Sequence, residues 1–334
     1  MSDSASFRYS VVVPVFRNRD SLPLVIERLS ELADRRDGRL EAVFVVDGSP
    51  DDSLAVLRQE LAERALDAQV LSLSRNFGSF SAIRAGMAVA RGSFVAVMAA
   101  DLQEPIDVVS AFFDVLERDE CDIVFGQRTD RSDPALSATG SRVYWWLYRR
   151  FVNREIPVGG VDVFGCTQLV CREITSFTET HTSLIGLLFW VGHRRAFVPY
   201  QRVPRHSGTS GWTVGRKVRY LFDSVYAFTD LPIILLQLLG GIGFVMSILV
   251  GAIVFIGWMV GAVRQPGYTP LMIAILASAS ALLLGLGVVG SYVWRTYENG
   301  KARPLELTAS HETFEGSRLR RAVGADETQG GGAT

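Results

Sequence analysis

The 334-residue sequence has few of the residues that build disulfides and zinc sites. It contains only three cysteines (Cys121, Cys166 and Cys171) and four scattered histidines. An odd number of cysteines without a Cys-x-x-Cys pattern excludes a disulfide framework, so we expect reduced thiols in a cytosolic domain and no zinc site. Residues 1–10 also lack the apolar core of a signal peptide, and nothing in them predicts export of the N-terminal part.

Charged residues are absent from two long stretches, 231–263 and 265–294, which only Arg264 separates. A membrane-spanning helix needs about 20 mostly apolar residues. The alternative is a pair of buried core helices, but soluble helices seldom run so far without a polar face. We therefore predict two transmembrane helices, at about 231–260 and 270–294, within a hairpin that covers residues 231–296.

Basic residues flank the pair of apolar stretches on the outside: Arg216, Lys217 and Arg219 before the first, and Arg295, Lys301 and Arg303 after the second. The positive-inside rule then predicts a multi-pass protein of the cytoplasmic (inner) membrane with both termini and the N-terminal domain in the cytosol. Residues 206–230 mix aromatic and basic side chains, which favours an amphipathic segment at the membrane interface. The polar tail, 297–334, is predicted to be cytosolic and largely disordered.

The first part of the sequence alternates strand-like and helix-like segments. We expect strands at 10–16, 40–47, 69–73, 94–99 and 122–125, and helices at 21–35, 51–66, 79–90 and 106–118. This alternation predicts an α/β domain, residues 1–205, with a mostly parallel sheet and helices on both faces. Ligands of such sheets bind at the carboxyl ends of the strands, where Asp47 and Asp101 are expected.

Four motifs occur in a fixed order: VVVPVF (11–16), VVDGSPDDS (45–53), LSRNFG (73–78) and AADLQEP (99–105). Followed by two apolar stretches, they resemble the family 2 glycosyltransferases of the GT-A (Rossmann-like) fold. Within that family the sequence is similar to the polyprenyl-phosphate glycosyltransferases, which include dolichol-phosphate mannose synthases and bacterial undecaprenyl-phosphate glycosyltransferases. The resemblance implies a mixed, mostly parallel sheet, a nucleotide-sugar donor, a lipid-phosphate acceptor and Mg²⁺ or Mn²⁺ as cofactor.

Residue chemistry at the motifs agrees with a diphosphate ligand. A leaving diphosphate needs a divalent cation or basic side chains, and Mg²⁺ and Mn²⁺ prefer oxygen ligands. Asp101 and Gln103 offer such oxygens and are the predicted metal ligands, although Asp101 could instead cap the helix that follows. By resemblance Asp47 contacts the nucleotide. The predicted donor-binding residues are Pro14, Val15, Asp47, Gly48, Arg75, Asn76, Gly78 and Ala100.

Two positions depart from the family pattern. Val46 and Ala99 stand where the family usually has acidic residues. Because Ala99 removes a carboxylate, we expect weak metal affinity in the free enzyme, with the donor diphosphate completing the shell. The same changes leave open a degenerate, non-catalytic member that acts as a membrane-anchored partner.

A phosphate acceptor and a diphosphate donor repel each other, so basic side chains must lie between them. The predicted phosphate- and acceptor-binding residues are Arg128, Arg131, Arg202, Arg205, Ser210 and Lys217. Asp162 matches an acidic residue near the family's reaction centre and, with Asp101, is predicted to be catalytic. Since the second pKa of a phosphate monoester is about 6, the acceptor is already ionised, and Asp162 orients the acceptor or balances charge.

These features predict an inverting transferase that glycosylates polyprenyl (undecaprenyl) phosphate at the cytosolic face, for cell-envelope glycans. Another membrane glycan acceptor remains an alternative. The sequence chooses neither the sugar nor the nucleotide base among UDP, dTDP and GDP, and it predicts no nucleic-acid partner. Glycine-rich faces in the apolar stretches allow close helix packing within the hairpin or in a homo-oligomer: Gly240, Gly241, Gly243, Gly285, Gly287 and Gly290.

Overall fold

The structure is a computed structural model that describes residues 7–129, 161, 163–179, 182–203, 231–260 and 268–316. Within residues 231–300 it describes the side chains at only some positions.

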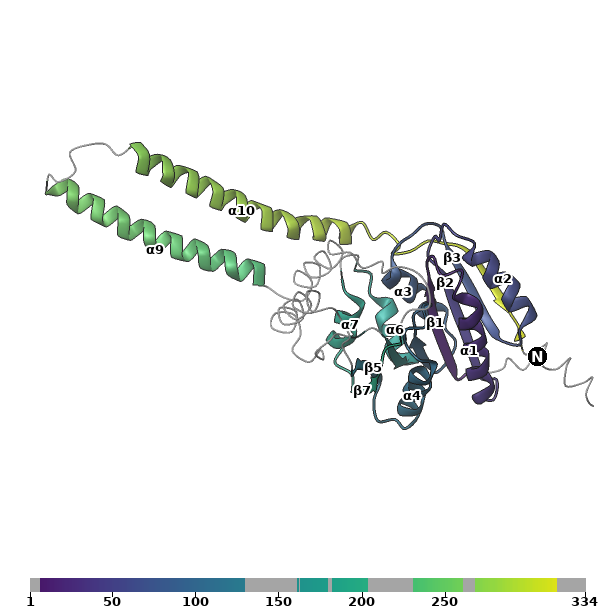
Figure 1. Cartoon of the computed structure of the whole chain (residues 1–334). Helices are drawn as coiled ribbons and strands as arrows, with labels where there is room; N and C mark the ends of the chain where they lie inside the picture. The colour runs from purple at the N-terminus through teal and green to yellow at the C-terminus, as the bar shows by residue number, and fades with distance from the viewer. Residues whose placement is uncertain are drawn as a thin grey trace, which may run out of the picture.

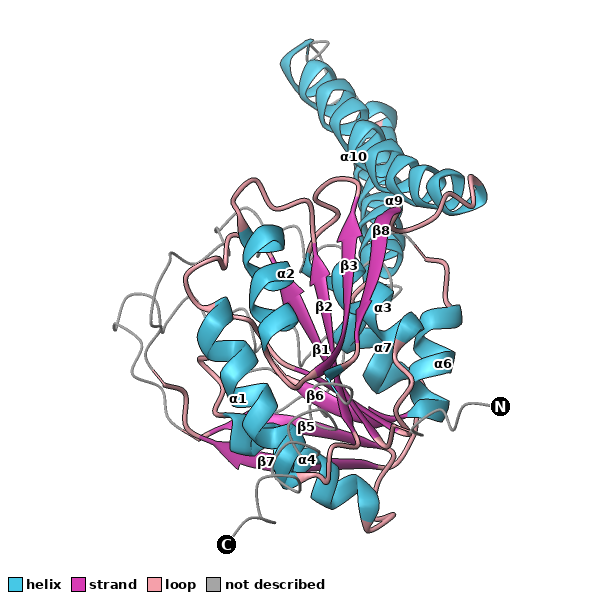
Figure 2. Cartoon of the chain, turned by 90° about the vertical axis from the view of Figure 1, so that its right-hand side faces the viewer, coloured by secondary structure: helices cyan, strands magenta, loops and turns pink. Residues whose placement is uncertain are grey.

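The described chain forms an eight-stranded mixed sheet in the order β7-β5-β6-β4-β1-β2-β3-β8 (Figure 2). Neighbouring strands run parallel except where β6 pairs with β4 and β5, and where β8 pairs with β3. The strands are β1 (Tyr9–Val15), β2 (Leu40–Val46), β3 (Asp67–Leu73), β4 (Phe94–Val97), β5 (Ile123–Arg128), β6 (Phe164–Thr167), β7 (Arg195–Tyr200) and β8 (Thr308–Phe314).

Helices cover both faces of this sheet. The helices that pack on it are α1 (Leu22–Arg35), α2 (Ser53–Glu63), α3 (Ser79–Val89), α4 (Ile106–Glu117), α6 (Gln168–Ser176) and α7 (Leu184–Trp190). Alternate side chains of a strand point to opposite faces. Val11 and Val13 of β1 accordingly join the core under α1, α2 and α4, whereas Val12 joins a second core under α3, α6 and α7.

The predicted alternation of strands and helices up to residue 125 is confirmed, with boundaries that differ by a few residues. The GT-A-like mixed sheet is also as expected. The prediction of a largely disordered tail is wrong for β8, because residues 308–314 pair with the edge of β3. A polar strand is stable there because its backbone groups bond to β3 while its exposed face carries the polar side chains. The sheet domain is therefore not contiguous in the sequence.

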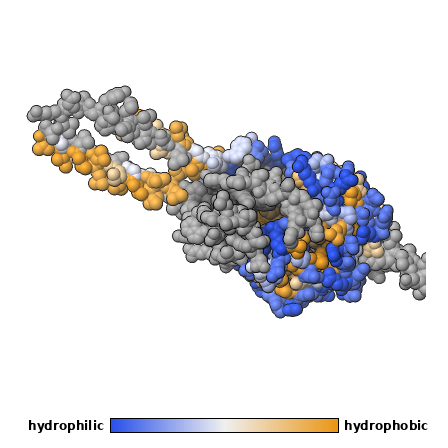
Figure 3. Space-filling view, in the orientation of Figure 1, coloured by the Kyte–Doolittle hydropathy of each residue, from blue (hydrophilic) through white to orange (hydrophobic). Residues whose placement is uncertain are grey.

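Two long helices, α9 (Leu231–Met259) and α10 (Tyr268–Gly300), run side by side away from the sheet (Figure 1). A Cβ built on Gly285 of α10 would lie 3.9 Å from Leu236 Cδ2 of α9. Apolar side chains of both helices are exposed, including Leu238, Ile253 and Leu283, and the apolar surface of α9 contrasts with the polar sheet domain (Figure 3).

Within the described residues, no helix combines the length and the hydropathy needed to cross a membrane.

Candidate functional site

The parallel strands bring the predicted residues to one edge of the sheet. β1, β2, β3 and β4 are parallel neighbours, so their carboxyl ends meet there. Asp47 follows β2, Arg75 follows β3, and Asp101 follows β4. β5 runs in the same direction, which places Arg128 at this edge as well. The predicted placement of Asp47 and Asp101 at the carboxyl edge thus follows from the strand directions, which bring Arg75 and Arg128 to the same edge.

The 74–78 loop, between β3 and α3, is held by the residues that follow β2. Asp47 is buried, and its two carboxylate oxygens accept hydrogen bonds from the backbone N–H groups of Phe77 (2.7 Å) and Gly78 (2.8 Å). Burial raises the pKa of Asp47, although both hydrogen bonds and the charge of Arg75 oppose this. The Asp47 side chain therefore fixes the loop by binding the backbone of the loop. The Asp-Gly-Ser sequence around Asp47 did not predict this role.

Gly48 allows the same loop to approach closely. Its φ of +55° is a conformation that favours glycine. A Cβ at this position would lie 2.3 Å from the carbonyl carbon of Arg75 and 2.4 Å from the backbone nitrogen of Asn76. The predicted donor-binding residues Asp47, Gly48, Arg75, Asn76 and Gly78 therefore form one structural unit.

The outer side of the 74–78 loop is basic and exposed. The guanidinium of Arg75 lies 3.9 Å from the centre of the Phe77 ring, and one of its nitrogens donates to the carbonyl of Asn76 at 3.2 Å. Stacking on an aromatic ring leaves the guanidinium edge free to donate hydrogen bonds. The loop can thus present positive charge to an anionic ligand.

The loops after β1 and β2 are joined by Asp51. Its carboxylate accepts hydrogen bonds from the hydroxyls of Ser49 (2.6 Å) and Ser53 (2.7 Å) and from the backbone N–H of Arg19 (3.3 Å). Ser49 Oγ also accepts from the backbone N–H of Arg17 at 2.7 Å. Desolvation alone would raise the pKa of Asp51, but these hydrogen bonds lower it. The sequence predicted a helix that starts at Asp51; in the structure Asp51 joins two loops, and α2 begins at Ser53.

The segment after β4 carries the predicted metal ligands. Asp101 and Gln103 are partly buried, and the backbone N–H of Gln103 donates to Asp101 Oδ1 at 3.3 Å. The carbonyl of Gln103 accepts from the backbone N–H of Val203 at 2.9 Å, and Ser21 Oγ donates to the carbonyl of Ala100 at 2.7 Å. These bonds fix the course of the segment.

The oxygens of Asp101 and Gln103 have the chemistry that Mg²⁺ and Mn²⁺ prefer. Among the residues that the structure describes, no cluster of three or more His, Cys, Asp and Glu side chains could hold a metal ion. Two side chains leave most of an octahedral shell to water or to phosphate oxygens of a ligand.

Two predicted arginines reach the same side of the domain. Arg128 ends β5 opposite Tyr200 of the parallel strand β7, and Arg202 follows two residues later. One guanidinium nitrogen of Arg202 lies 3.9 Å from Glu104 Oε1, a buried carboxylate in the segment after β4. Arg202 therefore adjoins the segment that contains Asp101, and Arg128 lies at the end of the strand paired with β7.

Other predicted residues are buried or lie outside the described part of the chain. Val15 is fully buried and can offer only its backbone, whose carbonyl accepts from Asp47 N at 3.0 Å, and Pro14 is partly buried. Val46 packs in the core under α1 and α2. The predictions for Arg131, Asp162, Arg205, Ser210 and Lys217 fall outside the described residues.

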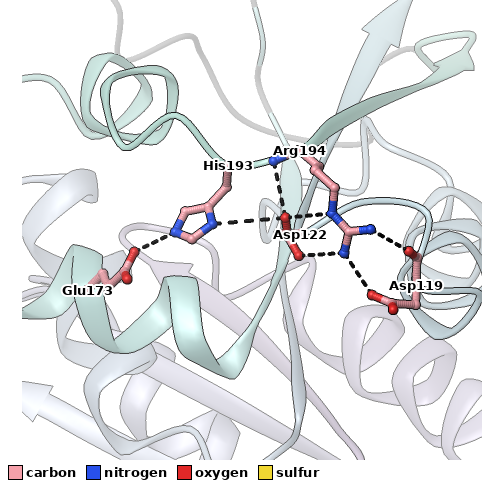
Figure 4. A network of polar contacts seen from close by, with 5 residues as sticks. All are labelled: Asp119, Asp122, Glu173, His193 and Arg194. Carbon is pink, nitrogen blue, oxygen red and sulfur yellow. Dashed lines mark hydrogen bonds and ion pairs between the residues drawn. The ribbon is translucent and has the colours of Figure 1, made fainter.

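A second polar network lies at the opposite edge of the sheet and has a structural role (Figure 4). Arg194, just before β7, bonds to Asp122, just before β5, at 3.0 Å and 3.1 Å, and to Asp119 at 2.7 Å. His193 Nε2 lies 2.6 Å from Glu173 of α6. The hydrogen bonds from Arg194 hold the pKa of Asp122 below its usual value. This network joins the starts of two strands, away from the carboxyl edge.

The fold and the site define an α/β protein of the class that binds its ligands at the carboxyl edge of a mainly parallel sheet. Residues 10–176 match the family described as glycosyl transferase family 2, and the chain belongs to that family. The protein is accordingly a glycosyltransferase.

Several relatives align over nearly the whole chain. Glycosyltransferase sll0501 of Synechocystis sp. is 31% identical, covering 90% of this chain and 94% of the relative. The prophage bactoprenol glucosyl transferase homolog of Escherichia coli is 26% identical, covering 89% and 97%. The bactoprenol glucosyl transferase of Shigella phage SfX is 28% identical, covering 91% and 100%.

A solved structure of glucosyl-3-phosphoglycerate synthase from Mycobacterium tuberculosis is also similar. It shares 18% identity and a TM-score of 0.47, covering 67% of this chain and 81% of that one. At this level of similarity it adds nothing to the family assignment.

Proposed function

We propose that the protein is a membrane-bound inverting glycosyltransferase that moves a sugar from a nucleotide-sugar donor to a polyprenyl phosphate at the cytosolic face. The observation that carries this proposal is the extent of the match to bactoprenol glucosyl transferases. The match covers 89–91% of the chain. The unmatched part is shorter than α9 and α10 together, which have 29 and 33 residues. The relationship therefore includes the long helices as well as the sheet.

The carboxyl edge supports transfer to an anionic acceptor. A phosphate oxygen of the acceptor attacks the anomeric carbon, the new carbon–oxygen bond forms, and the nucleoside diphosphate leaves with the electrons of the broken bond. One displacement inverts the anomeric configuration. Arg75 and Asn76 contact the donor diphosphate, while Arg128 and Arg202 reduce the repulsion between the two phosphate groups.

Asp101 and Gln103 would hold a Mg²⁺ or Mn²⁺ ion, which supplies positive charge to the leaving diphosphate when bound. With only these two ligands from the segment after β4, we expect weak metal affinity before the donor binds. Arg131, Arg205, Ser210 and Lys217 are proposed to bind the acceptor phosphate, and Asp162 to orient the acceptor or balance its charge.

We further propose that α9 and α10 form a transmembrane hairpin in the inner membrane. This part of the proposal rests on the full sequence of the region, including the positions whose side chains the structure does not describe. The two uncharged stretches, 231–263 and 265–294, each exceed the length of about 20 residues that a bilayer requires. Residues 206–230 would then lie at the membrane interface.

The test is release of nucleoside diphosphate by the full-length protein in detergent with Mg²⁺ or Mn²⁺. UDP-, dTDP- and GDP-sugars are compared, each with and without undecaprenyl phosphate. We expect one donor to release its nucleoside diphosphate only in the presence of the lipid, which would name both substrates. If folded protein released none from any donor with the lipid, the acceptor assignment would be wrong, and nucleotide binding without turnover would indicate a non-catalytic member.

A further inference from the structure

One face of α10 is exposed along the second half of the helix. Side chains that are three or four residues apart lie on the same side of a helix. Residues at these spacings form a single row: Leu282, Leu286, Val289, Val293, Tyr297 and Lys301. The four aliphatic side chains of the row are each more than half exposed. The face is therefore apolar until its last turns, where an aromatic and then a basic residue follow.

Two exposed aromatic rings lie at the point where the apolar part of this face ends. Trp294 is 56% exposed and Tyr297 is 58% exposed, and their ring centres are 5.8 Å apart. The ammonium group of Lys301 lies 4.4 Å from the centre of the Tyr297 ring and 5.3 Å from that of Trp294, and it also pairs with Glu298. A cation over an aromatic ring is attracted to it. Lys301 therefore holds both rings in place while they remain exposed.

The chain turns out of the helix directly after this cluster and leads to the candidate site. Ala302 has a φ of +47°, a conformation that ends α10. Residues 301–307 then connect α10 to β8, and the carbonyl of Leu307 accepts from the backbone N–H of Ser74 at the carboxyl edge of the sheet. A connection of this length spans at most about 25 Å. The depth of α10 in a membrane would therefore limit how far the carboxyl edge can lie from that membrane.

We propose that Trp294 and Tyr297 form an anchor that binds the headgroup layer of a phospholipid bilayer and sets the depth of α10. The order of aliphatic, aromatic and charged side chains along the face matches the order of hydrocarbon, interface and water. The indole N–H and the phenol O–H can donate to lipid oxygens while the rings contact acyl chains. The proposal rests on the proposed transmembrane hairpin, and it places the carboxyl edge near the layer that contains a lipid-phosphate acceptor.

The side chains of the face favour lipid over a second copy of the chain as its partner. Close packing of helices in a membrane uses small residues such as glycine, alanine and serine. The aliphatic members of this face are Leu282, Leu286, Val289 and Val293, which are large. Side chains of this size suit contact with acyl chains, so the bilayer is the partner to test first.

The depth of a spin label measures the anchor without any substrate. Val289→Cys carries a nitroxide in the full-length protein, in vesicles of phosphatidylethanolamine and phosphatidylglycerol, and collisions with O₂ and with a water-soluble nickel chelate report its depth. The native cysteines are buried and should take little label. We expect the label to lie in the hydrocarbon. Adding Trp294→Leu and Tyr297→Leu should move it deeper by about 5 Å, one helical turn, because the apolar stretch becomes longer.

Val293→Leu is the matched control for these substitutions. It lies on the same face and changes the size of a side chain without removing an interfacial group, so the depth of the label should stay that of the wild type. An equal depth in the double variant and the control would overturn the anchor and leave the hairpin in place. A label that meets the nickel chelate but not O₂ would contradict the hairpin itself. A label shielded from both reagents would show that the face packs on protein, which would also overturn the proposal.

Transfer in two media tests whether the depth of α10 matters for the reaction. With the donor found in the release assay, transfer to undecaprenyl phosphate is measured in the same vesicles and in detergent. We expect the variant that lacks both rings to lose about fivefold or more of its rate in vesicles, because the site is displaced from the acceptor, and to keep its rate in detergent, where no bilayer fixes the depth. An equal loss in both media, or no loss in vesicles, would overturn the link between the anchor and transfer.

Discussion

At the carboxyl edge, some side chains bond to the backbone of neighbouring loops, and others have polar groups that a ligand could contact. Asp47 is buried and bonded to two backbone N–H groups, so its charge serves the 74–78 loop. Asp101 is partly buried after β4, and its Oδ1 accepts a hydrogen bond of 3.3 Å from the backbone N–H of Gln103 in its own segment. Two aspartates that look alike in the sequence therefore make different contacts: Asp47 holds a loop from another strand, whereas Asp101 bonds within its own segment.

Replacing Asp101 with Asn should lower kcat by about a hundredfold or more, because a neutral amide is a poorer ligand for a hard cation and stabilises less charge at the leaving group. The unfolding midpoint should stay close to that of the wild type. Asp107→Asn is the matched control, since Asp107 lies nearby at the start of α4 and makes an exposed ion pair with Arg35. Near-normal turnover by Asp101→Asn would remove its assignment as a metal ligand.

At the scale of elements, the site depends on loops that are fastened to one another. Asp51 joins the loop after β1 to the loop after β2, and Asp47 joins the end of β2 to the loop after β3. Each connection uses a carboxylate that accepts N–H or O–H groups from a neighbouring segment. The loops can therefore keep a defined shape although they lie outside the regular sheet.

The Asp51 connection predicts a pH dependence of stability. The pKa of Asp51 is lowered in the folded protein from its ordinary value of 3.8, so its stabilisation is fully present above that value and is lost as the pH falls through the lowered pKa. Asp51→Asn should lower the free energy of unfolding by about 1–2 kcal/mol near neutral pH and by less in acid. Thermal unfolding in detergent from neutral pH to about pH 3 measures both.

Asp52→Asn provides the control for this prediction. Asp52 is the neighbouring residue, but its side chain is 71% exposed and pairs with Arg19 at the surface. Exposed ion pairs contribute little, so this variant should follow the wild type across the pH range. The interpretation of Asp51 would be wrong if both variants lost the same stability at every pH.

For the whole molecule, the main feature is the attachment of an α/β domain to two long apolar helices (Figure 1). The chain leaves the sheet domain before α9 and returns after α10 as β8. If α9 and α10 cross the membrane as proposed, both connections must lie on the same side of the membrane as the sheet domain.

Thiol labelling in intact bacterial cells tests this topology. Gln265→Cys lies between the two helices and should react with a membrane-impermeant maleimide. Arg303→Cys lies after α10 and should react only after the cells are opened, because basic flanks stay on the cytosolic side. The native cysteines are free and buried and should give little background. Labelling of both positions, or of Arg303→Cys alone, in intact cells would contradict the proposed hairpin.

Much of the fold could be predicted because it is encoded locally. Apolar periodicity located the strands and helices from β1 to β5, and the expected strand directions then placed Asp47 and Asp101 at one edge. The uncharged stretches likewise predicted long helices at α9 and α10. Each of these conclusions depends on neighbouring residues or on a connection rule, so no distant contact had to be known.

Only the tertiary structure decided which distant segments meet. The polar residues of β8 have little apolar content of their own and become a strand because β3 offers free backbone groups. From the sequence, Asp47 could be a turn residue or a ligand contact. The structure shows that two N–H groups of the 74–78 loop bond to its carboxylate. Local sequence sets the propensity of a segment to form a helix or a strand. The free energy of long-range pairing and burial decides which segment it pairs with, and therefore what a buried charge contacts.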